Sequence, residues 1–453
     1  MANHVRIASG QGFWGDLQTA PFDQVNKGPI DYIMMDFLAE VTMSIMQKQK
    51  KRNPDHGYAR DVVPLIEHIL PLCMEKNVKI ITNGGGANPE GCRNAVFEWA
   101  RKKGFKGLKI GTVLGDDILD KIDTFVKSGI TLNNMDTGES IGVVRERLQS
   151  ANVYFGAWPI VEALDQGAHI VITGRTTDTG LTLAPMIHEF GWKKDEWDKL
   201  AAGTIAGHIL ECGGQASGGN FSASWRSVPD LAHIGFPIAE AYSSGEIIIT
   251  KHEQSGGLVS MQTVKEQLLY EIGDPSDYIT PDCVADFTSI QLEEVGKDRV
   301  RMYNVKGRPA TDSYKVSMSY LDGYTAVGTL TFSWPDALEK AKAADEILRT
   351  RLNDHGRGFE EIRSEYMGYN SCHGPLAEAN GELNEVVLRI GVRAHDHKSV
   401  ESFAQELAPL ILTGPPGVTG FAGGRPKARE VIAYWPALLH KGAVTPKVIV
   451  EEI

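Results

Sequence analysis

Val78-Lys79-Ile80-Ile81-Thr82-Asn83-Gly84-Gly85-Gly86-Ala87-Asn88-Pro89 is a run of β-formers followed by three glycines and a proline. Proline favours the first turn of a helix, so this order predicts a strand, a tight turn and a helix that begins at Pro89. Free backbone N–H groups at such a junction attract phosphate or carboxylate. Gly84, Gly85, Gly86 and Asn88 are therefore candidate substrate-binding residues. The alternative is a tight turn that binds nothing.

The same alternation of strands and helices continues through the first half of the chain. Predicted strands lie at residues 5–8, 31–35, 78–82, 108–113 and 169–173, and the clearest predicted helices at 61–76 and 89–103. This order is typical of an α/β fold with a parallel sheet, whose ligands bind beyond the carboxyl ends of the strands. We expect residues 1–218 to form this domain, with glycine-rich loops at the strand ends.

The second half has a different pattern. Predicted strands lie at residues 246–250, 300–305, 315–321, 326–332, 385–392 and 447–451, and predicted helices at 257–271, 337–352 and 400–412. The spacing of several of these strands is that of hairpins. We expect residues 219–453 to form an α+β domain, for example a ferredoxin-like one.

Composition excludes several classes of protein. The net charge of −12 argues against a nucleic-acid-binding surface, which needs clustered Lys and Arg. No apolar run reaches the roughly 18 residues of a membrane span, and the start of the chain does not resemble a signal peptide. The five cysteines are widely spaced without a CxxC pair, which favours reduced thiols. We expect a cytoplasmic homo-oligomer without membrane or nucleic-acid partners.

Glu211-Cys212-Gly213-Gly214-Gln215-Ala216-Ser217-Gly218-Gly219-Asn220 combines an acid, a thiol and two amides with four glycines. A carboxylate at an apolar helix end can have its pKa raised into the working range, so Glu211 is the candidate general acid or base. Gln215 and Asn220 are candidate substrate-binding amides. A simple helix C-terminus explains the glycines equally well. His208, Glu211 and Cys212 share one helical face, but their mixed ligand character makes a metal site the weaker interpretation.

Two further glycine-flanked clusters carry charge. Lys251 and His252 follow a predicted strand and are candidate catalytic residues, a lysine to polarise a carbonyl and a histidine to move protons. Arg175, next to Gly174, is a candidate clamp for a substrate carboxylate, together with Asp178. The alternatives are surface positions for the first pair and a structural ion pair for the second. We expect all three clusters to meet at one site.

Gly10-Gln11-Gly12-Phe13-Trp14-Gly15 matches the GxGxxG pattern of dinucleotide-binding folds, and Asp36 lies about 20 residues further on. No helix opens directly after this turn, because Pro21 interrupts the following segment. A glycine turn at the end of the first strand is the better interpretation, and no redox cofactor is favoured.

Together these segments resemble the AtuA-type acyclic terpene utilisation family. The resemblance rests on residues 8–16, 82–89, 174–178 and 211–221, on Lys251-His252 with Gly256-Gly257, and on residues 268–275. It implies a place in the catabolism of branched carboxylic acids, whose intermediates travel as coenzyme A thioesters. It also implies a possible partner, since some relatives act beside a separate small companion protein. No established set of catalytic residues comes with the resemblance.

These observations predict a catabolic enzyme that acts on a small branched organic acid or its coenzyme A thioester. A proton shuttle and a carboxylate clamp suit a hydratase, a dehydratase or a carbon–carbon lyase. Coenzyme A would enter as part of the substrate. The competing hypothesis is a noncatalytic subunit or small-molecule-binding module of a multi-protein catabolic complex.

Overall fold

The computed structural model describes residues 4–356, 358–378, 381–420 and 424–453. Its contacts divide the chain into two compact units, one made of Met1–Ser319 with Tyr434–Ile453 and the other of Tyr320–Ala433. The domain boundary expected near Gly218 falls inside the first unit. Strands that follow Gly218 there extend the sheet that begins with the first strand of the chain.

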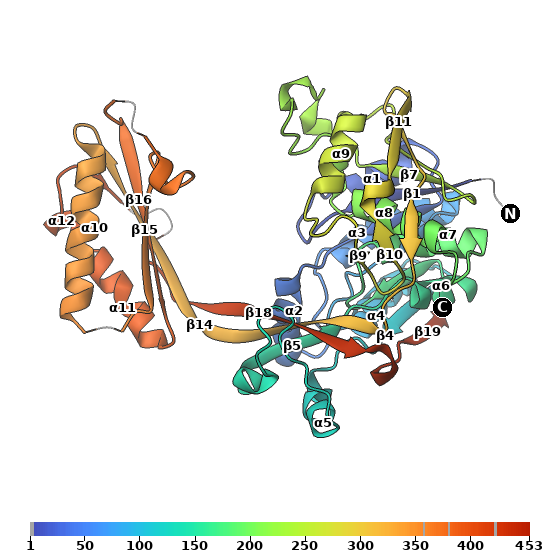
Figure 1. The fold of residues 1–453 in the computed structure, drawn as a ribbon, viewed down its shortest axis with the longest axis horizontal. Helices are drawn as coiled ribbons and strands as arrows, with labels where there is room; N and C mark the ends of the chain where they lie inside the picture. The colour runs from blue at the N-terminus through green and yellow to red at the C-terminus, as the bar shows by residue number, and fades with distance from the viewer. Residues whose placement is uncertain (1–3, 357, 379–380, 421–423) are drawn as a thin grey trace. The chain divides into compact units, whose positions relative to one another are not determined.

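A mixed sheet of ten strands forms the centre of the first unit (Figure 1). Its parallel core contains, in spatial order, β1 (His4–Gln11), β2 (Tyr32–Met35), β3 (Lys79–Thr82), β6 (Ile170–Thr173) and β4 (Lys109–Leu114). Ile33 pairs with Ile80, and Ile81 with Val171, so both faces of the core are apolar. Sheets buried on both faces read as continuous apolar runs, which is why the sequence predicted this α/β fold correctly.

Antiparallel strands complete both edges of this sheet. Beyond β1 lie β7 (Ile238–Tyr242), β8 (Ile247–Thr250), β12 (Arg299–Tyr303) and β11 (Gln291–Gly296). Beyond β4 lies β19 (Lys447–Glu452), where Val450 pairs with Gly111. The strand predicted at 447–451 therefore exists, but it belongs to the sheet of the first unit.

Helices cover the two faces of the sheet. One layer contains α1 (Ala20–Lys27), α3 (Val62–Lys76) and α4 (Pro89–Lys102), and the other α6 (Trp158–Asp165), α7 (Gly180–Phe190) and α8 (Trp197–Leu210). α2 (Glu40–Arg52) contacts β5 (Leu148–Val153), and α5 (Ile122–Lys127) follows β4 in the chain. Within the described ranges, no helix is both long and apolar enough to cross a membrane.

A short three-stranded sheet and one further helix complete the first unit. The sheet contains β13 (Lys306–Arg308), β10 (Val284–Asp286) and β9 (Tyr278–Ile279), and the helix is α9 (Met261–Leu269). The helix predicted at 257–271 is shorter than expected at both ends. Ser260 caps it, with its hydroxyl accepting from the Thr263 N–H, and Tyr270 returns to an extended conformation.

The second unit packs helices against one face of an antiparallel sheet (Figure 1). Its elements are β14 (Ser313–Ser333), β15 (Glu361–Met367), β16 (Glu385–Ala394), β17 (Val418–Thr419), β18 (Arg429–His440), α10 (Ala337–Asp354), α11 (His397–Leu407) and α12 (Leu410–Thr413), and both β14 and β18 run on into the first unit. Leu330, Leu388 and Phe403 belong to its buried core.

Two sequence predictions for this region are wrong in detail. The hairpin expected between 315–321 and 326–332 is one continuous strand, β14, because Gly323 absorbs a positive φ of +91° without reversing the chain. The helix expected at 400–412 is divided into α11 and α12. Pro409, which has no N–H to donate, stands immediately before α12.

Candidate functional site

A cavity of about 570 Å³ opens at the carboxyl ends of the parallel strands. Its lining residues come from the segments after β1, β2 and β6 and from the ends of α8 and α9. They are Gly12, Phe13, Trp14, Asp36, Phe37, Leu38, Ala39, Glu40, Thr42, Arg175, Asp178, Glu211, Cys212, Gln215, Tyr270 and Glu271. We call this cavity the acidic pocket, since five carboxylates and one arginine line it. Its position is the one that α/β sheets favour for ligands.

Arg175 is the single cation that lines the acidic pocket, and hydrogen bonds and a cation–π contact hold both its backbone and its side chain in place. Its backbone N–H donates to Asp116 Oδ2 at 2.9 Å, and Nη1 donates to the Leu38 carbonyl at 2.9 Å. The guanidinium carbon lies 4.1 Å from the centre of the Tyr154 ring. Gly174 is needed beside it, because a Cβ there would lie 2.4 Å from Asp116 Oδ1. The side chain is therefore pre-organised before any ligand arrives.

Arg175 and Asp178 form an ion pair that leaves binding capacity unused. Arg175 Nη2 donates to Asp178 Oδ2 at 3.2 Å. Within the described residues, Arg175 Nε and Asp178 Oδ1 are buried without a hydrogen-bond partner, although Oδ1 lies 3.2 Å from Arg175 Nη2 in the ion pair. Unsatisfied buried polar atoms are rare in folded proteins, and they often mark a place where a water molecule or a ligand binds. The two hypotheses for this pair, an ion pair and a substrate clamp, are thus compatible.

Burial separates the acidities of the carboxyl groups. It raises the pKa of Asp178 well above its ordinary value, in spite of the opposing charge of Arg175. Burial likewise raises the pKa of Asp36 to about 6, although Arg175 and a hydrogen bond from Asn83 oppose it. Glu40 behaves in the opposite way: burial would raise its pKa, but Arg175 and Lys315 outweigh burial and lower it. Asp178 and Asp36 are thus the two carboxyl groups whose protonated form burial favours.

Glu211 and His208 share one proton. His208 Nε2 lies 3.0 Å from the Gln267 carbonyl oxygen, which can only accept, so Nε2 carries a hydrogen. His208 Nδ1 lies 2.9 Å from Glu211 Oε1. This contact also needs a hydrogen, carried either by the imidazole or by the carboxyl group. Burial alone would lower the pKa of His208, but the charge and hydrogen bond of Glu211 raise it, which favours the protonated imidazole.

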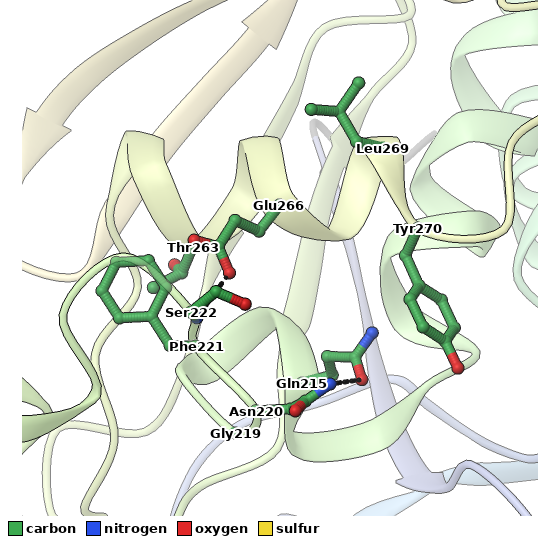
Figure 2. A pocket seen from close by; sticks show the side chains of 9 residues that line it. All are labelled: Gln215, Gly219, Asn220, Phe221, Ser222, Thr263, Glu266, Leu269 and Tyr270. Atoms are coloured by element: carbon green, nitrogen blue, oxygen red, sulfur yellow. Dashed lines mark hydrogen bonds between the residues drawn. The ribbon is translucent and has the colours of Figure 1, made fainter. Parts of the chain in front are cut away.

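Three side-chain amides form a hydrogen-bond chain that ends at the backbone carbonyl of His208. The Gln267 side-chain N–H donates to the His208 carbonyl at 2.9 Å, and Gln215 donates to Gln267 Oε1 at 2.8 Å. Asn220 in turn donates to Gln215 Oε1 at 3.5 Å. Figure 2 shows Gln215 and Asn220 in a neighbouring pocket of about 330 Å³, whose wall also includes Tyr270. Gln215 and Tyr270 border both pockets, so they divide the two spaces.

The GxGxxG loop borders the acidic pocket without the geometry of a nucleotide turn. A Cβ on Gly12 would lie 2.8 Å from the Glu211 carbonyl oxygen and from the backbone of Cys212. The glycine is therefore required by the close approach of two protein loops. Beside them, burial raises the pKa of the Cys212 thiol to about 12, so this sulfur is not a thiolate nucleophile.

Lys251 and His252 lie elsewhere. They line a different pocket, together with Arg6 and Arg299. Lys251 Nζ donates to the Ser255 carbonyl at 3.0 Å and lies 3.4 Å from Asp298 Oδ2, and His252 Nε2 donates to the Gln24 carbonyl at 2.9 Å. The structure thus brings two of the three predicted clusters together in the acidic pocket and places the third in a separate one.

The Gly84–Gly86 turn is enclosed by protein. A Cβ on Gly85 would lie 2.6 Å from the Thr173 carbonyl oxygen, and one on Gly86 would lie 2.1 Å from Met46 Sδ. Asn88 caps α4 by accepting from the Gly91 N–H at 3.1 Å, and it donates to the carbonyl groups of Pro54 and His56. This geometry matches the tight-turn alternative more closely than the anion-binding one.

Sequence reasoning did not select four residues that shape the acidic pocket. Asp36 stood out only as part of a nucleotide-binding pattern. It directly follows the strand predicted at 31–35, and this position at a strand end could have identified it as a site residue. His208 was considered only as a metal ligand. Glu40 and Tyr154, which share a hydrogen bond of 3.0 Å, gave no local signal because 114 positions separate them. Within the described ranges, no group of three or more His, Cys, Asp or Glu side chains is arranged to hold a metal ion.

Comparison with known proteins places nearly the whole chain in one family. The family model described as acyclic terpene utilisation family protein AtuA matches residues 5–450. The chain therefore belongs to this family, which is implicated in acyclic terpene catabolism, and the resemblance seen in the sequence is confirmed. No curated protein and no solved structure gives a significant match.

Proposed function

We propose that this member of the acyclic terpene utilisation family is an acid–base lyase for a small branched organic acid or its coenzyme A thioester. Hydration or dehydration is the reaction that the acidic pocket supports best. One observation carries the proposal: Asp178, whose pKa burial raises well above its ordinary value, and Glu211, which is hydrogen-bonded to His208, line the same cavity as a fixed arginine. Two carboxyl groups in different environments of one cavity are a common acid and base of an active site.

Arg175 is suited to hold the carbonyl or carboxylate end of the substrate. Its Nε has no partner among the described residues, and burial makes an added charge-assisted hydrogen bond stronger than it would be in water. A substrate held there would acidify its own neighbouring carbon, because the cation stabilises negative charge that develops on the carbonyl oxygen.

Asp178 and Glu211 then take the two proton-transfer roles. In a dehydration, Glu211 removes a proton from the carbon beside the carbonyl, and Asp178 gives its proton to the hydroxyl on the next carbon. The C–H and C–O bonds break, a C=C bond forms, and water leaves. Hydration is the reverse, with the same groups in opposite roles. The contact between His208 Nδ1 and Glu211 Oε1 holds the Glu211 carboxyl group in position for this transfer.

The rim of the pocket favours a branched apolar chain. Phe13, Trp14, Leu38 and Tyr270 border the cavity, and Phe13 is 59% exposed. Exposed large apolar side chains beside a polar cavity are typical of a binding site for a partly apolar ligand. The charged groups would therefore meet the acid end of the substrate and the aromatic groups its hydrocarbon end.

The test compares Glu211→Gln and Asp178→Asn with wild type on a panel of branched acyl-CoA esters and free hydroxy acids. Gain or loss of water is followed by mass spectrometry. Removing a general acid or base costs about 10² to 10⁴ in rate, so both variants should lose turnover to that extent. The control, Glu98→Gln, removes an exposed carboxylate on α4 and should keep wild-type rates. Wild-type rates in both pocket variants would refute the proposal.

A second readout needs no substrate. The imidazole resonances of His208 report its protonation, and Glu211→Gln removes the main group that raises the pKa of His208. We expect that pKa to fall in the variant, as followed by NMR titration. An unchanged value would mean that the two side chains do not share a proton. If wild type is inactive alone and active with a small companion protein, the noncatalytic-subunit hypothesis gains support.

A further inference from the structure

A second charged pocket, of about 290 Å³, lies in the same unit and contains none of the groups of the acidic pocket. Its wall is built from β1, the loop between α1 and β2, the end of β8 and the turn between β11 and β12. Five cations line it: Arg6, Lys27, Lys251, Lys297 and Arg299. Only two carboxylates, Glu253 and Asp298, line it as well. We call it the basic pocket.

Two arginines of the basic pocket share one carboxylate. Arg6 Nη1 lies 2.9 Å from Glu240 Oε1, and Arg299 pairs with both oxygens of the same group. The Glu240 side chain is buried. One negative charge between two guanidinium groups leaves one positive charge without compensation. Arg6 Nε is also buried and has no hydrogen-bond partner among the described residues.

The lysines differ in how far they are neutralised. Lys251 lies 3.4 Å from Asp298, and Lys27 lies 3.1 Å from Asp23. Lys297 is exposed on the turn between β11 and β12, and the described ranges contain no ion-pair partner for it. Lys297 adds a positive charge to the wall of the pocket and Glu253 adds a negative one, so the five cations exceed the four carboxylates that pair with them or line the pocket by one charge.

His252 is held against this wall in a fixed orientation. Its Nε2 donates to the Gln24 carbonyl at 2.9 Å, and a Cβ on Gly28 would lie 2.6 Å from its Nδ1. The absence of a side chain at Gly28 is thus required for the imidazole to lie there. The result is a packed polar surface whose charge is positive.

We propose that the basic pocket binds a phosphate group. Guanidinium forks and lysine ammonium groups are the side chains that recognise phosphate, and Arg6 Nε is buried without a hydrogen-bond partner among the described residues. The phosphate can be free inorganic phosphate or part of a nucleotide or coenzyme. This assignment does not depend on the lyase chemistry proposed for the acidic pocket.

Isothermal titration calorimetry with inorganic phosphate, ADP and coenzyme A tests the site in the full chain. Wild type should bind at least one of the three saturably, and Lys297→Glu should weaken that binding about tenfold or more. Lys106→Glu makes the same charge reversal at an exposed position outside the pocket and should leave binding unchanged. Binding of all three ligands would mean that the phosphate alone is recognised. Binding only of ADP or coenzyme A would mean that the organic part contributes.

An NMR titration of wild type gives a readout that does not depend on the stability of any variant. The His252 imidazole resonances should shift with added ligand in proportion to the occupancy measured by calorimetry. The proposal is overturned if none of the three ligands binds saturably, or if Lys297→Glu and Lys106→Glu bind with the same affinity.

Discussion

Asp116 lies beneath the arginine of the acidic pocket, and Asp116→Asn should make the protein more stable at alkaline pH than at acidic pH, relative to wild type. The buried Asp116 carboxylate accepts hydrogen bonds from the Arg175 N–H and from Asn152 Nδ2, both on Oδ2 and both at 2.9 Å. An asparagine oxygen can accept the same two bonds. The substitution therefore removes the charge and keeps the support for Arg175.

The magnitude follows from the acidity of Asp116. Burial raises its pKa from 3.8 to about 6, against the hydrogen bonds that oppose this change. Because the folded state holds the proton more tightly, the stability from this group is complete below pH 3.8 and is lost as pH rises through 6. The rise in the pKa of Asp116 from 3.8 to about 6 corresponds to about 3 kcal/mol of unfolding free energy in total. About 1.4 kcal/mol of this is lost between pH 5 and pH 8.

Urea unfolding of wild type and Asp116→Asn at pH 5 and pH 8 measures this change. The difference in unfolding free energy between the two proteins should shift by about 1.4 kcal/mol in favour of the variant from pH 5 to pH 8. Asp55→Asn, at an exposed position, controls for the loss of one negative charge. A difference that stays constant with pH would show that Asp116 does not titrate as its burial implies.

Arg175→Lys keeps the positive charge but loses the guanidinium fork that reaches Asp178. We expect kcat/KM on the best acyl-CoA substrate to fall about 10²-fold. A loss of less than threefold would show that Arg175 does not hold the substrate carbonyl or carboxylate in the proposed way. Gly12→Val forces a branched side chain against the Cys212 backbone, and we expect a loss of about 1–3 kcal/mol in thermal unfolding. Gly273→Val, at a glycine with open space around it, is the matched control and should unfold like wild type.

The parallel core could be predicted from sequence because its signals are local. Ile80 and Ile81 alternate between two apolar faces within four residues, and Pro89 marks the start of α4 without reference to any other part of the chain. The errors concern segments whose structure depends on pairing with a strand that is distant in the sequence. Gly323 gives a turn signal, but β14 pairs with β16 from Tyr324 to Ser333 and also pairs with β5 and β18, and these distant partners keep the strand continuous. The partner of 447–451, which is β4, was likewise beyond any local pattern.

The candidate site shows the same limit. Arg175, Asp178 and Glu211 could be selected because strand and helix ends next to glycines are recognisable in a sequence. Their relation to Lys251 could not be judged, because similar glycine-flanked clusters can lie in different pockets of one unit. The protonation of His208 depends on the carbonyl of Gln267, 59 positions away, and therefore requires coordinates.

The pairing of β19 with β4 has a consequence for synthesis on the ribosome. β4 ends at Leu114 and its neighbour begins at Lys447, so an edge of the central sheet stays uncovered while the intervening chain is made. At about 5–20 residues per second, that interval lasts roughly 20–70 s. Uncovered strand edges recruit other chains, so nascent copies on one messenger are exposed to mutual pairing throughout it. Emergence of β19 therefore ends the time during which the edge of β4 can pair with another chain. A premature stop codon just before Lys447 would leave that edge uncovered permanently.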